Sequence, residues 1–360
     1  MNIKNLDKNL LKKLGLIFGI IIGIFLIIII IKLVTGGKLE YTAIEDKMLT
    51  AAKKYYQENS NELPEVSGNT TTIETSKLVE KNYLKDLSKL VKNKNDNCSG
   101  SITVTNNNGY YLYSANLDCG DSYKTKKFNT MLTSNIVTSG DGLYNYNGTY
   151  IYRGETVNNY VSYAGKTWLI LRINSDGSIR MLETTKRDTV VWDDRYNSSR
   201  QSNTGINDFN VSRIKDSINY IYQTEFTDND KSYIFNQNLC IGKRNEADPG
   251  FDGTIECSNT VPNQPLGLLQ VNEFSIASID SGCKTITDPE CTNYNYLVGL
   301  SSYWTLTADA NNTYKVYKIS GNPFSSTASS SSRIRLVVNI NPNVNYVSGD
   351  GTSQNPYIFK

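Results

Sequence analysis

The chain has 360 residues, with 37 basic and 35 acidic side chains, and it contains no histidine. The absence of histidine excludes Ser-His-Asp and Cys-His catalysis, His-ligated zinc and HExxH peptidase sites. The balanced charge gives no electrostatic basis for binding nucleic acid, and the 25 tyrosines, with many Asn, Ser and Thr residues, favour a β-rich exterior protein.

An apolar run near the start of the chain predicts a membrane anchor. Residues 14–31 carry no charge, and at a rise of about 1.5 Å per residue they span roughly 27 Å, enough for the hydrocarbon core. We therefore predict a single transmembrane helix over residues 14–34. A cleaved signal peptide is the alternative, but its apolar core is typically about 7–15 residues long and ends at an A-x-A-like site. Here the run is longer and TGGKLEY follows it.

The charges that flank the anchor predict its orientation. Four lysines precede it, against the single acid Asp7. By the positive-inside rule, residues 1–13 form a cytoplasmic tail and the bulk of the chain lies outside the cell membrane.

The first outer domain is predicted over residues 35–127 as a small α+β unit. Apolar residues at helical spacing predict a helix over 42–59, with Thr42 and Glu45 as a T-x-x-E capping box. A second helical pattern covers 75–91.

A β-hairpin follows these helices. The strands SITVT and YYLYSANL flank an NNNG turn in which Gly109 is expected to adopt positive φ. Cys98 enters the first strand and Cys119 leaves the second, so a disulfide between them would tie the open end of the hairpin.

These features together resemble the pilin-like region of bacterial surface proteins. The likeness covers residues 14–127 and rests on the apolar anchor, the helix with AAKKYYQEN, an LP-containing loop, LVEKNYL and the two-cysteine hairpin. It implies a stalk-like domain next to the membrane. It also supplies an alternative function, a minor pilin or pseudopilin-like component of a membrane assembly.

The second domain is predicted over residues 128–360, and SGDG turns at 139–142 and 348–351 bracket most of it. TWLILRI is apolar on both faces, as in a central strand, and SIRMLETT returns antiparallel after the NSDG turn. VSRIKDSINYIYQTEF is predicted as a helix with Ser212 as its N-cap. A shorter helix is expected in GLLQVNEFSIAS, and strands in YWTLTAD, TYKVYKI and RIRLVVNI.

The second domain is similar to C-type-lectin-like surface domains, which share a broad fold with formylglycine-generating-enzyme-like proteins. The likeness rests on the order of AGKTWLILRI, LGLLQVNEFSIASID, NYNYL, YWTLT, RIRLVVNI and SGDGTSQNPY, with Arg335 at the expected arginine and Leu336 in place of the usual proline. It implies a β-rich fold with one or two helices, and an α+β class for the whole chain.

All six cysteines lie on the predicted outer side, and no CxxC motif occurs. A zinc knuckle or thioredoxin-like redox site is therefore not expected. Because each successive pair sits within one local unit, we predict three structural disulfides, joining Cys98 with Cys119, Cys240 with Cys257, and Cys283 with Cys291.

Two segments are candidate ligand sites. Trp192-Asp193-Asp194 resembles the WND calcium motif of sugar-binding lectins, although a tryptophan in such a turn also suits simple packing. Three acids between two cysteines are weak candidates for calcium, the alternative being a solvated loop; they are Asp248, Asp252 and Glu256.

A pair of arginines is a further candidate. Arg333 and Arg335 lie on one face of a strand. They could bind an anion or pair with an acid in the sheet.

These observations predict a non-enzymatic binding or adhesion protein on a bacterial surface, whose partner is a glycan, a protein or an envelope component. Tyr and Asn supply adaptable contacts at low entropic cost, which suits such a role. A histidine-free envelope hydrolase that uses two carboxylates is the enzymatic alternative, with no pair identifiable from sequence. Calcium is the only cofactor that the sequence suggests.

Overall fold

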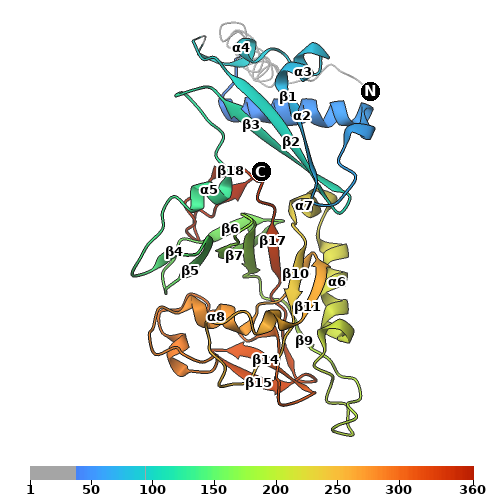
Figure 1. Ribbon diagram of the computed structural model, residues 1–360, viewed down its shortest axis with the longest axis vertical. Coiled ribbons are helices and arrows are strands. Elements are labelled where there is room, and N and C mark those ends of the chain that lie inside the picture. Colours follow the sequence, from blue (N-terminus) through green and yellow to red (C-terminus); the bar gives the residue numbers. More distant parts are fainter. Residues whose placement is uncertain (1–37, 94) are drawn as a thin grey trace, which may run out of the picture. The chain divides into compact units, whose positions relative to one another are not determined.

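The computed structural model describes residues 38–360 apart from residue 94. The predicted cytoplasmic tail (1–13) and transmembrane helix (14–34) lie outside the described residues. Within the described part, no helix combines the length and the apolar character needed to cross a bilayer. The fold is α+β and rich in strands, as predicted (Figure 1).

The chain forms two compact units. The first comprises the described part of Met1–Ser60, with Thr72–Ile102 and Ala115–Lys124, and the second comprises Asn61–Thr71, Thr103–Ser114 and Thr125–Lys360.

The first helix, α2 (Tyr41–Glu58), follows the predicted apolar spacing, but its predicted capping box is wrong. The helix begins at Tyr41, and the N-cap residue Glu40 makes no side-chain cap. Glu45 is instead buried, and it accepts a hydrogen bond from the Tyr123 hydroxyl at 2.8 Å. Glu45 thus has a tertiary partner, and Thr42 lies within the helix and not at its N-cap.

The predicted helix over 75–91 is two short helices, α3 (Thr75–Glu80) and α4 (Leu87–Leu90). Between them, Asn82 adopts a φ of 62°, which an α-helix does not tolerate. Each helix still buries leucines that the apolar pattern identified, Leu78 in α3 and Leu87 in α4.

The predicted hairpin is confirmed. Strands β2 (Ser99–Asn107) and β3 (Tyr110–Asp118) join β1 (Thr70–Glu74) in a three-stranded sheet. At the turn, Asn108 and Gly109 have φ values of 54° and 88°, as a type I′ turn requires at both central positions.

The second unit is built on a seven-stranded sheet. Its order is β12-β17-β8-β7-β5-β4, with β6 also paired to β7. The strands are β4 (Gly142–Tyr146), β5 (Thr149–Arg153), β6 (Tyr160–Tyr163), β7 (Lys166–Ile173), β8 (Ile179–Glu183), β12 (Leu266–Gly267) and β17 (Val337–Ile340).

The interior position of β7 in this sheet explains its composition. It has neighbours on both sides, and Trp168, Leu169, Ile170 and Leu171 are all buried, as the unbroken apolar run predicted. β8 returns antiparallel to it after the predicted turn.

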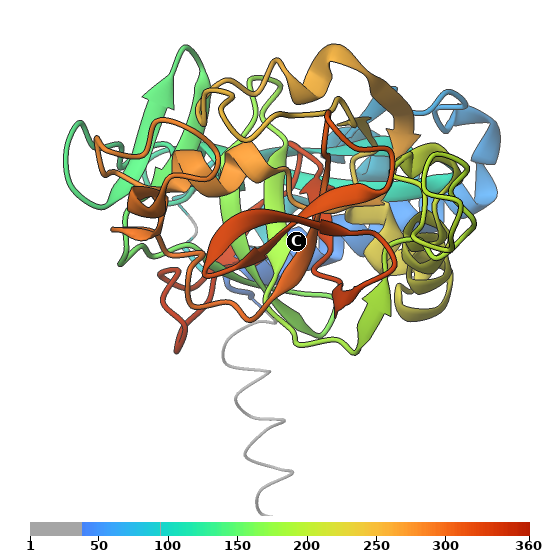
Figure 2. The ribbon, with the colours of Figure 1, turned by 90° about the horizontal axis from the view of Figure 1, so that it is seen from below.

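A second sheet of five strands has the order β15-β14-β13-β16-β9, and β14 and β15 face the viewer in Figure 2. Two small ribbons pair β10 with β11 and β18 with β19. These strands are β9 (Thr189–Val191), β10 (Gln237–Cys240), β11 (Thr260–Gln264), β13 (Tyr303–Ala308), β14 (Lys315–Ser320), β15 (Asn322–Thr327), β16 (Ser331–Arg333), β18 (Tyr346–Ser348) and β19 (Ile358–Phe359).

The segment RIRLVVNI, predicted as one strand, is divided between the two sheets. β16 belongs to the five-stranded sheet and β17 to the seven-stranded sheet. Ile334 and Leu336, which lie between them, are both buried. The apolar pattern therefore continues across a change of sheet.

The remaining helices lie in the second unit, apart from one short 3-10 turn near its boundary. Helix α6 begins after the predicted N-cap Ser212, whose hydroxyl accepts from the Lys215 N–H at 3.4 Å. The helices are α5 (Phe128–Leu132), α6 (Arg213–Glu225), α7 (Asp228–Tyr233) and α8 (Val271–Ala277), and the 3-10 turns are η2 (Ser60–Glu62), η3 (Phe209–Val211), η4 (Glu256–Ser258) and η5 (Pro289–Thr292).

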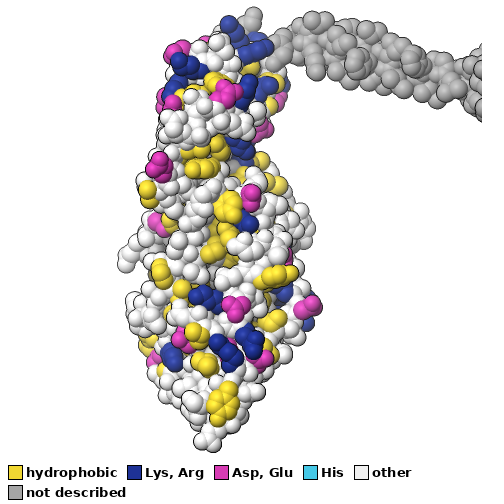
Figure 3. All heavy atoms as spheres, turned by 90° about the vertical axis from the view of Figure 1, so that its right-hand side faces the viewer, with side chains coloured by type: hydrophobic (Ala, Val, Ile, Leu, Met, Phe, Trp, Pro, Cys, Tyr) yellow, Lys and Arg dark blue, Asp and Glu magenta, His cyan; other side chains and the backbone are white. Residues whose placement is uncertain are grey.

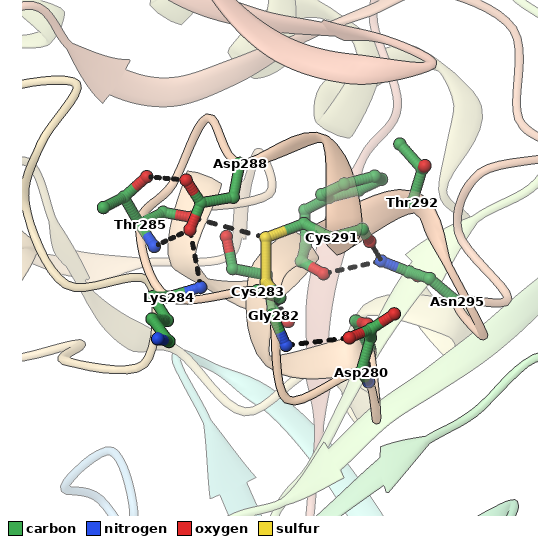
Figure 4. The surroundings of a disulfide bond; sticks show 12 residues. Asp280, Gly282, Cys283, Lys284, Thr285, Asp288, Cys291, Thr292 and Asn295 are labelled. Atoms are coloured by element: carbon green, nitrogen blue, oxygen red, sulfur yellow. Dashed lines mark hydrogen bonds between the residues drawn. A yellow bond between two sulfur atoms is a disulfide. The ribbon is translucent and has the colours of Figure 1, made fainter.

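The three predicted disulfides are present with the predicted pairing: Cys98–Cys119, Cys240–Cys257 and Cys283–Cys291. Figure 4 shows the last of these, beside a loop in which Asp288 accepts hydrogen bonds from Lys284 and Thr285. Both of its cysteines are buried in a cluster that includes Phe274 of α8. This bridge therefore fixes the loop that follows α8.

Candidate functional site

The structure places Trp192, the first residue of the predicted WND-like site, in the core. Its ring is fully buried against Phe209, with 6.4 Å between ring centroids, and its Nε1 donates to the Thr305 carbonyl at 3.3 Å. Asp194 is at the surface, where it pairs with Arg213. The indole is thus a packing element and presents no face to a ligand.

Asp193 is also fully buried, and its carboxylate is occupied by donors from this chain. The Arg195 guanidinium lies 2.6 Å from Oδ2, and the N–H groups of Ile206 and Arg213 donate at 3.0 and 3.2 Å. Burial raises the pKa of Asp193, but the hydrogen bonds from Arg195 and these backbone donors lower it by a larger amount. The net shift of this pKa is therefore downward. The carboxylate holds a loop together.

The carboxylates of the acidic loop that was a candidate for calcium also have partners within the chain. Glu256 is fully buried and pairs at 2.6 Å with Arg244, which is also fully buried. The Asp252 carboxylate accepts from Thr254 and that of Asp248 from the Asn245 N–H. Nowhere in the described residues do three or more His, Cys, Asp or Glu side chains converge as metal ligands.

Arg335 has a structural environment, although not the acidic partner that sequence suggested. It is buried, and its Nη1 donates to the Thr184 carbonyl at 2.6 Å. Its guanidinium lies 5.5 Å from the Tyr303 ring centroid. Arg333 ends β16, opposite Thr189 of β9.

A polar cavity of about 330 Å³ lies where the β7–β8 hairpin meets β17 and β10. Nine of its twelve lining residues are polar. They are Arg172, Asn174, Asp176, Arg180, Asn236, Gln237, Asn238, Gln270 and Asn339, with Phe235, Leu239 and Cys240 as the others. We call this the polar cavity.

The floor of the polar cavity is a row of three side chains across the sheet. Arg172 of β7 pairs in register with Arg180 of β8, which pairs in turn with Asn339 of β17. Residues in register on neighbouring strands share one face, and like charges placed directly opposite each other are destabilising.

Glu273 of α8 offsets this repulsion. Its Oε1 lies 2.7 Å from Arg172 Nη1 and 2.5 Å from Arg180 Nε, and its Oε2 lies 3.0 Å from Arg180 Nη2. The same carboxylate accepts from the Gln270 N–H at 2.9 Å and so closes the capping box of α8. The Glu273 side chain therefore caps the N-terminus of α8 and also compensates the charge of the two arginines on the sheet.

The two guanidinium groups keep Glu273 ionised. Burial alone raises its pKa, but Arg180 and Arg172 lower it more, and the net shift is downward. Burial lowers the pKa of Arg172 to about 10, against the opposing effect of Glu273. Glu273 and Arg172 are thus both charged at neutral pH.

Arg172 is the most exposed member of this trio. Its side chain is 27% exposed, against 3% for Arg180 and Glu273. Its Nε donates to Asn174 at 2.7 Å. Two neighbouring amides keep an unpartnered atom, since Gln237 Nε2 and Asn339 Oδ1 are buried with no hydrogen bond.

A second cavity of about 310 Å³ adjoins the first and shares Arg172 and Asn174 with it. We call it the aromatic cavity, because three rings line it. Its other lining residues are Thr149, Ile151, Tyr152, Leu171, Ser175, Phe251, Gly253, Asn272, Glu273, Ile276 and Tyr296. Phe251 is 41% exposed, and its ring centroid lies 5.6 Å from the Arg153 guanidinium.

A different hollow, beside α6, is mainly apolar and has a volume of about 480 Å³. Its walls include Val190, Ile221 and the highly exposed Tyr220. The surface on this side of the molecule mixes hydrophobic and charged side chains (Figure 3). Among its lining residues no buried polar groups converge, so this hollow lacks the groups that would orient a ligand and make its binding specific.

Sequence reasoning missed both cavities. The predicted NSDG turn would set Arg172 opposite Ile179, whereas the observed loop 174–178 is one residue longer and sets Arg172 opposite Arg180. Glu273, Gln237 and Asn339 reach the same place through long-range packing, and no local pattern indicates that.

Comparison with known proteins adds no assignment. No protein-family model matches the chain. Neither the curated proteins nor the solved structures contain a match.

Proposed function

We propose that the chain is a binding protein displayed outside a bacterial membrane by residues 14–34, and that its ligand occupies the polar cavity. The partner is a glycan, a protein or another envelope component. The observation that carries this proposal is the Arg172–Arg180 pair, which the Glu273 carboxylate holds at the floor of the polar cavity.

The energetics of that pair favour a functional role. Burying charges is costly, and replacing a buried ion pair with apolar residues is often neutral or stabilising. Fold stability alone therefore does not require Arg172, Arg180 and Glu273 at this position. Concave sites where a few polar groups converge are the usual location of ligands.

The disulfides support the location. All six cysteines of the chain are paired, and such bonds form and persist outside the cytosol. In this proposal residues 35–127 form a pilin-like stalk domain and residues 128–360 a C-type-lectin-like domain.

Neither alternative function fits the cavity as well. A carboxylate hydrolase needs a general acid whose pKa is raised, whereas that of Glu273 is lowered. The other acid there, Asp176, accepts from the Ser178 hydroxyl and N–H. A purely structural pilin-like subunit has no need of a charged, open cavity.

The test is a binding screen with the full-length chain in detergent, against glycans and envelope fragments, with and without calcium. Arg172→Gln removes the exposed charge, and Arg200→Gln is its control, since Arg200 is exposed and lines neither cavity. We expect Arg172→Gln to weaken binding roughly 10- to 100-fold, the usual worth of a hydrogen bond to a charged group. Equal binding by a folded Arg172→Gln protein, or no ligand at all, would refute the proposal.

A further inference from the structure

We infer that the ligand is a linear glycan of at least two neutral sugar units, which runs from the aromatic cavity across Arg172 into the polar cavity and binds without calcium. This inference rests on the proposed function and specifies its ligand.

The charge balance of the site favours a neutral ligand. Arg172 and Arg180 contribute two positive charges, and Glu273 and Asp176 contribute two negative charges, so the sum is zero. A phosphate or carboxylate ligand would meet no excess of positive charge. It would also approach Asn339, whose unpartnered Oδ1 is an acceptor.

The chemistry of the lining suits hydroxyl groups. A sugar hydroxyl both donates and accepts, and the cavity offers both functions, since Gln237 Nε2 is an unpartnered donor and Asn339 Oδ1 an unpartnered acceptor. Arg172 adds donors at the junction with the neighbouring cavity. Such a lining orients a polyol through several hydrogen bonds at once.

The aromatic cavity supplies the complementary surface. Phe251, Tyr152 and Tyr296 line it, and aromatic rings pack against the apolar C–H faces of a ring-shaped ligand. Because the two cavities share Arg172 and Asn174, a ligand that reaches both would pass these residues, and a chain of linked sugar units suits that path.

The floor of the polar cavity does not offer the common mode of peptide recognition. Peptides are often captured as an added strand at a free sheet edge. β7 is paired to β5, β6 and β8, and β8 to β7 and β17. The cavity floor therefore presents side chains instead of unpaired backbone.

The experiment is calorimetric titration of the full-length chain in a detergent without a sugar headgroup. The probes are N-acetylglucosamine and glucose oligomers of one to four units, an oligogalacturonate of matched length as the anionic probe, and a polar tetrapeptide. We expect affinity for one neutral series to rise at least tenfold from one unit to two, and to be unchanged by EDTA.

Phe251→Ala tests the path between the cavities. It should remove the gain in affinity from the second unit, since Phe251 lines the aromatic cavity and not the polar cavity. Phe324→Ala is the matched control, because Phe324 is also 41% exposed and lines neither cavity. It should bind like the wild type.

Three results would overturn the inference: no dependence on length, equal behaviour of the two phenylalanine variants, or preference for the galacturonate or the peptide. If envelope fragments bind in an Arg172-dependent manner while neutral oligomers do not, the ligand class is wrong and the proposed function stands. If nothing binds in an Arg172-dependent manner, the proposed function fails as well.

Discussion

Glu273 lies between two guanidinium groups that the β7–β8 register sets opposite each other. Replacing it with glutamine keeps the shape of the side chain and removes the compensating charge. Because the change leaves buried, unpaired positive charges, Glu273→Gln should lower the free energy of unfolding by about 3–5 kcal/mol. Urea denaturation measures this, and the exposed Glu155→Gln should change stability by less than about 0.5 kcal/mol.

Glu273→Gln should also change how the stability of the fold depends on pH. The folded pKa of Glu273 is below its unfolded value, so its contribution to stability is complete above about pH 4.5 and is lost as the pH falls through the folded pKa. The stability difference between wild type and Glu273→Gln should therefore shrink in acid. Curves that stay parallel from pH 7 to pH 3 would contradict this account.

Asp193 offers a test of the WND-like segment, because the structure gives it a holding role away from both cavities. Asp193→Asn retains one acceptor and loses the charge that faces Arg195. We expect a loss of about 3 kcal/mol in unfolding free energy with unchanged affinity for the ligand in the binding screen. A folded variant with impaired binding would restore the predicted ligand role of this segment.

At the scale of elements, β10 forms one wall of the polar cavity and ends in a disulfide. Gln237 and Cys240 line the cavity, and Cys240 is bonded to Cys257. Replacing both cysteines with serine should cost about 2–4 kcal/mol and weaken ligand binding several-fold, because the wall loses its tether.

The Cys98–Cys119 pair is the control for that experiment. It closes a sequence separation of 21 residues, close to the 17 of Cys240–Cys257, so the loop-closure contribution to stability should be similar. Replacing Cys98 and Cys119 with serine should lower the melting temperature and leave the affinity for the ligand unchanged. Equal losses of affinity in the two variants would show that β10 has no special role.

Elements with local signals could be predicted, and those that depend on distant partners could not. The sequence predicted the NNNG turn, which requires positive φ, and the start of α6, which Ser212 caps. Glu45 fitted a capping box in the sequence, but in the structure its carboxylate accepts a hydrogen bond from Tyr123, which lies far along the chain. The division of RIRLVVNI between two sheets also has no local cause.

The candidate site shows the same limit more sharply. The predicted NSDG turn would have set Arg172 opposite Ile179, and only the longer loop 174–178 of the structure sets it opposite Arg180. Glu273 reaches them from α8, about 100 residues further along the chain. Its neutralising role depends on tertiary packing, and without it the two arginines read as ordinary exposed strand residues.

At the scale of the molecule, the second unit is assembled from three separated stretches of chain. Within it, the Asn107 side chain donates to the Ser232 carbonyl and accepts from Asn341. The unit therefore includes the tip of the β2–β3 hairpin, and a fragment that starts at residue 128 would lack these partners. Binding studies need the longer chain for this reason.

The orientation of the whole chain can be tested with single cysteines, because all six natural cysteines are paired and background labelling should be low. A membrane-impermeant maleimide should label Ser134→Cys on intact cells, since residue 134 is exposed on the predicted outer side. It should label Lys8→Cys only after permeabilisation, because the positive-inside rule predicts that this end lies in the cytoplasm. The reverse pattern would invert the topology. A mature chain that lacks residue 8 would show that the apolar run is a cleaved signal, and the protein would then need another means of remaining at the surface.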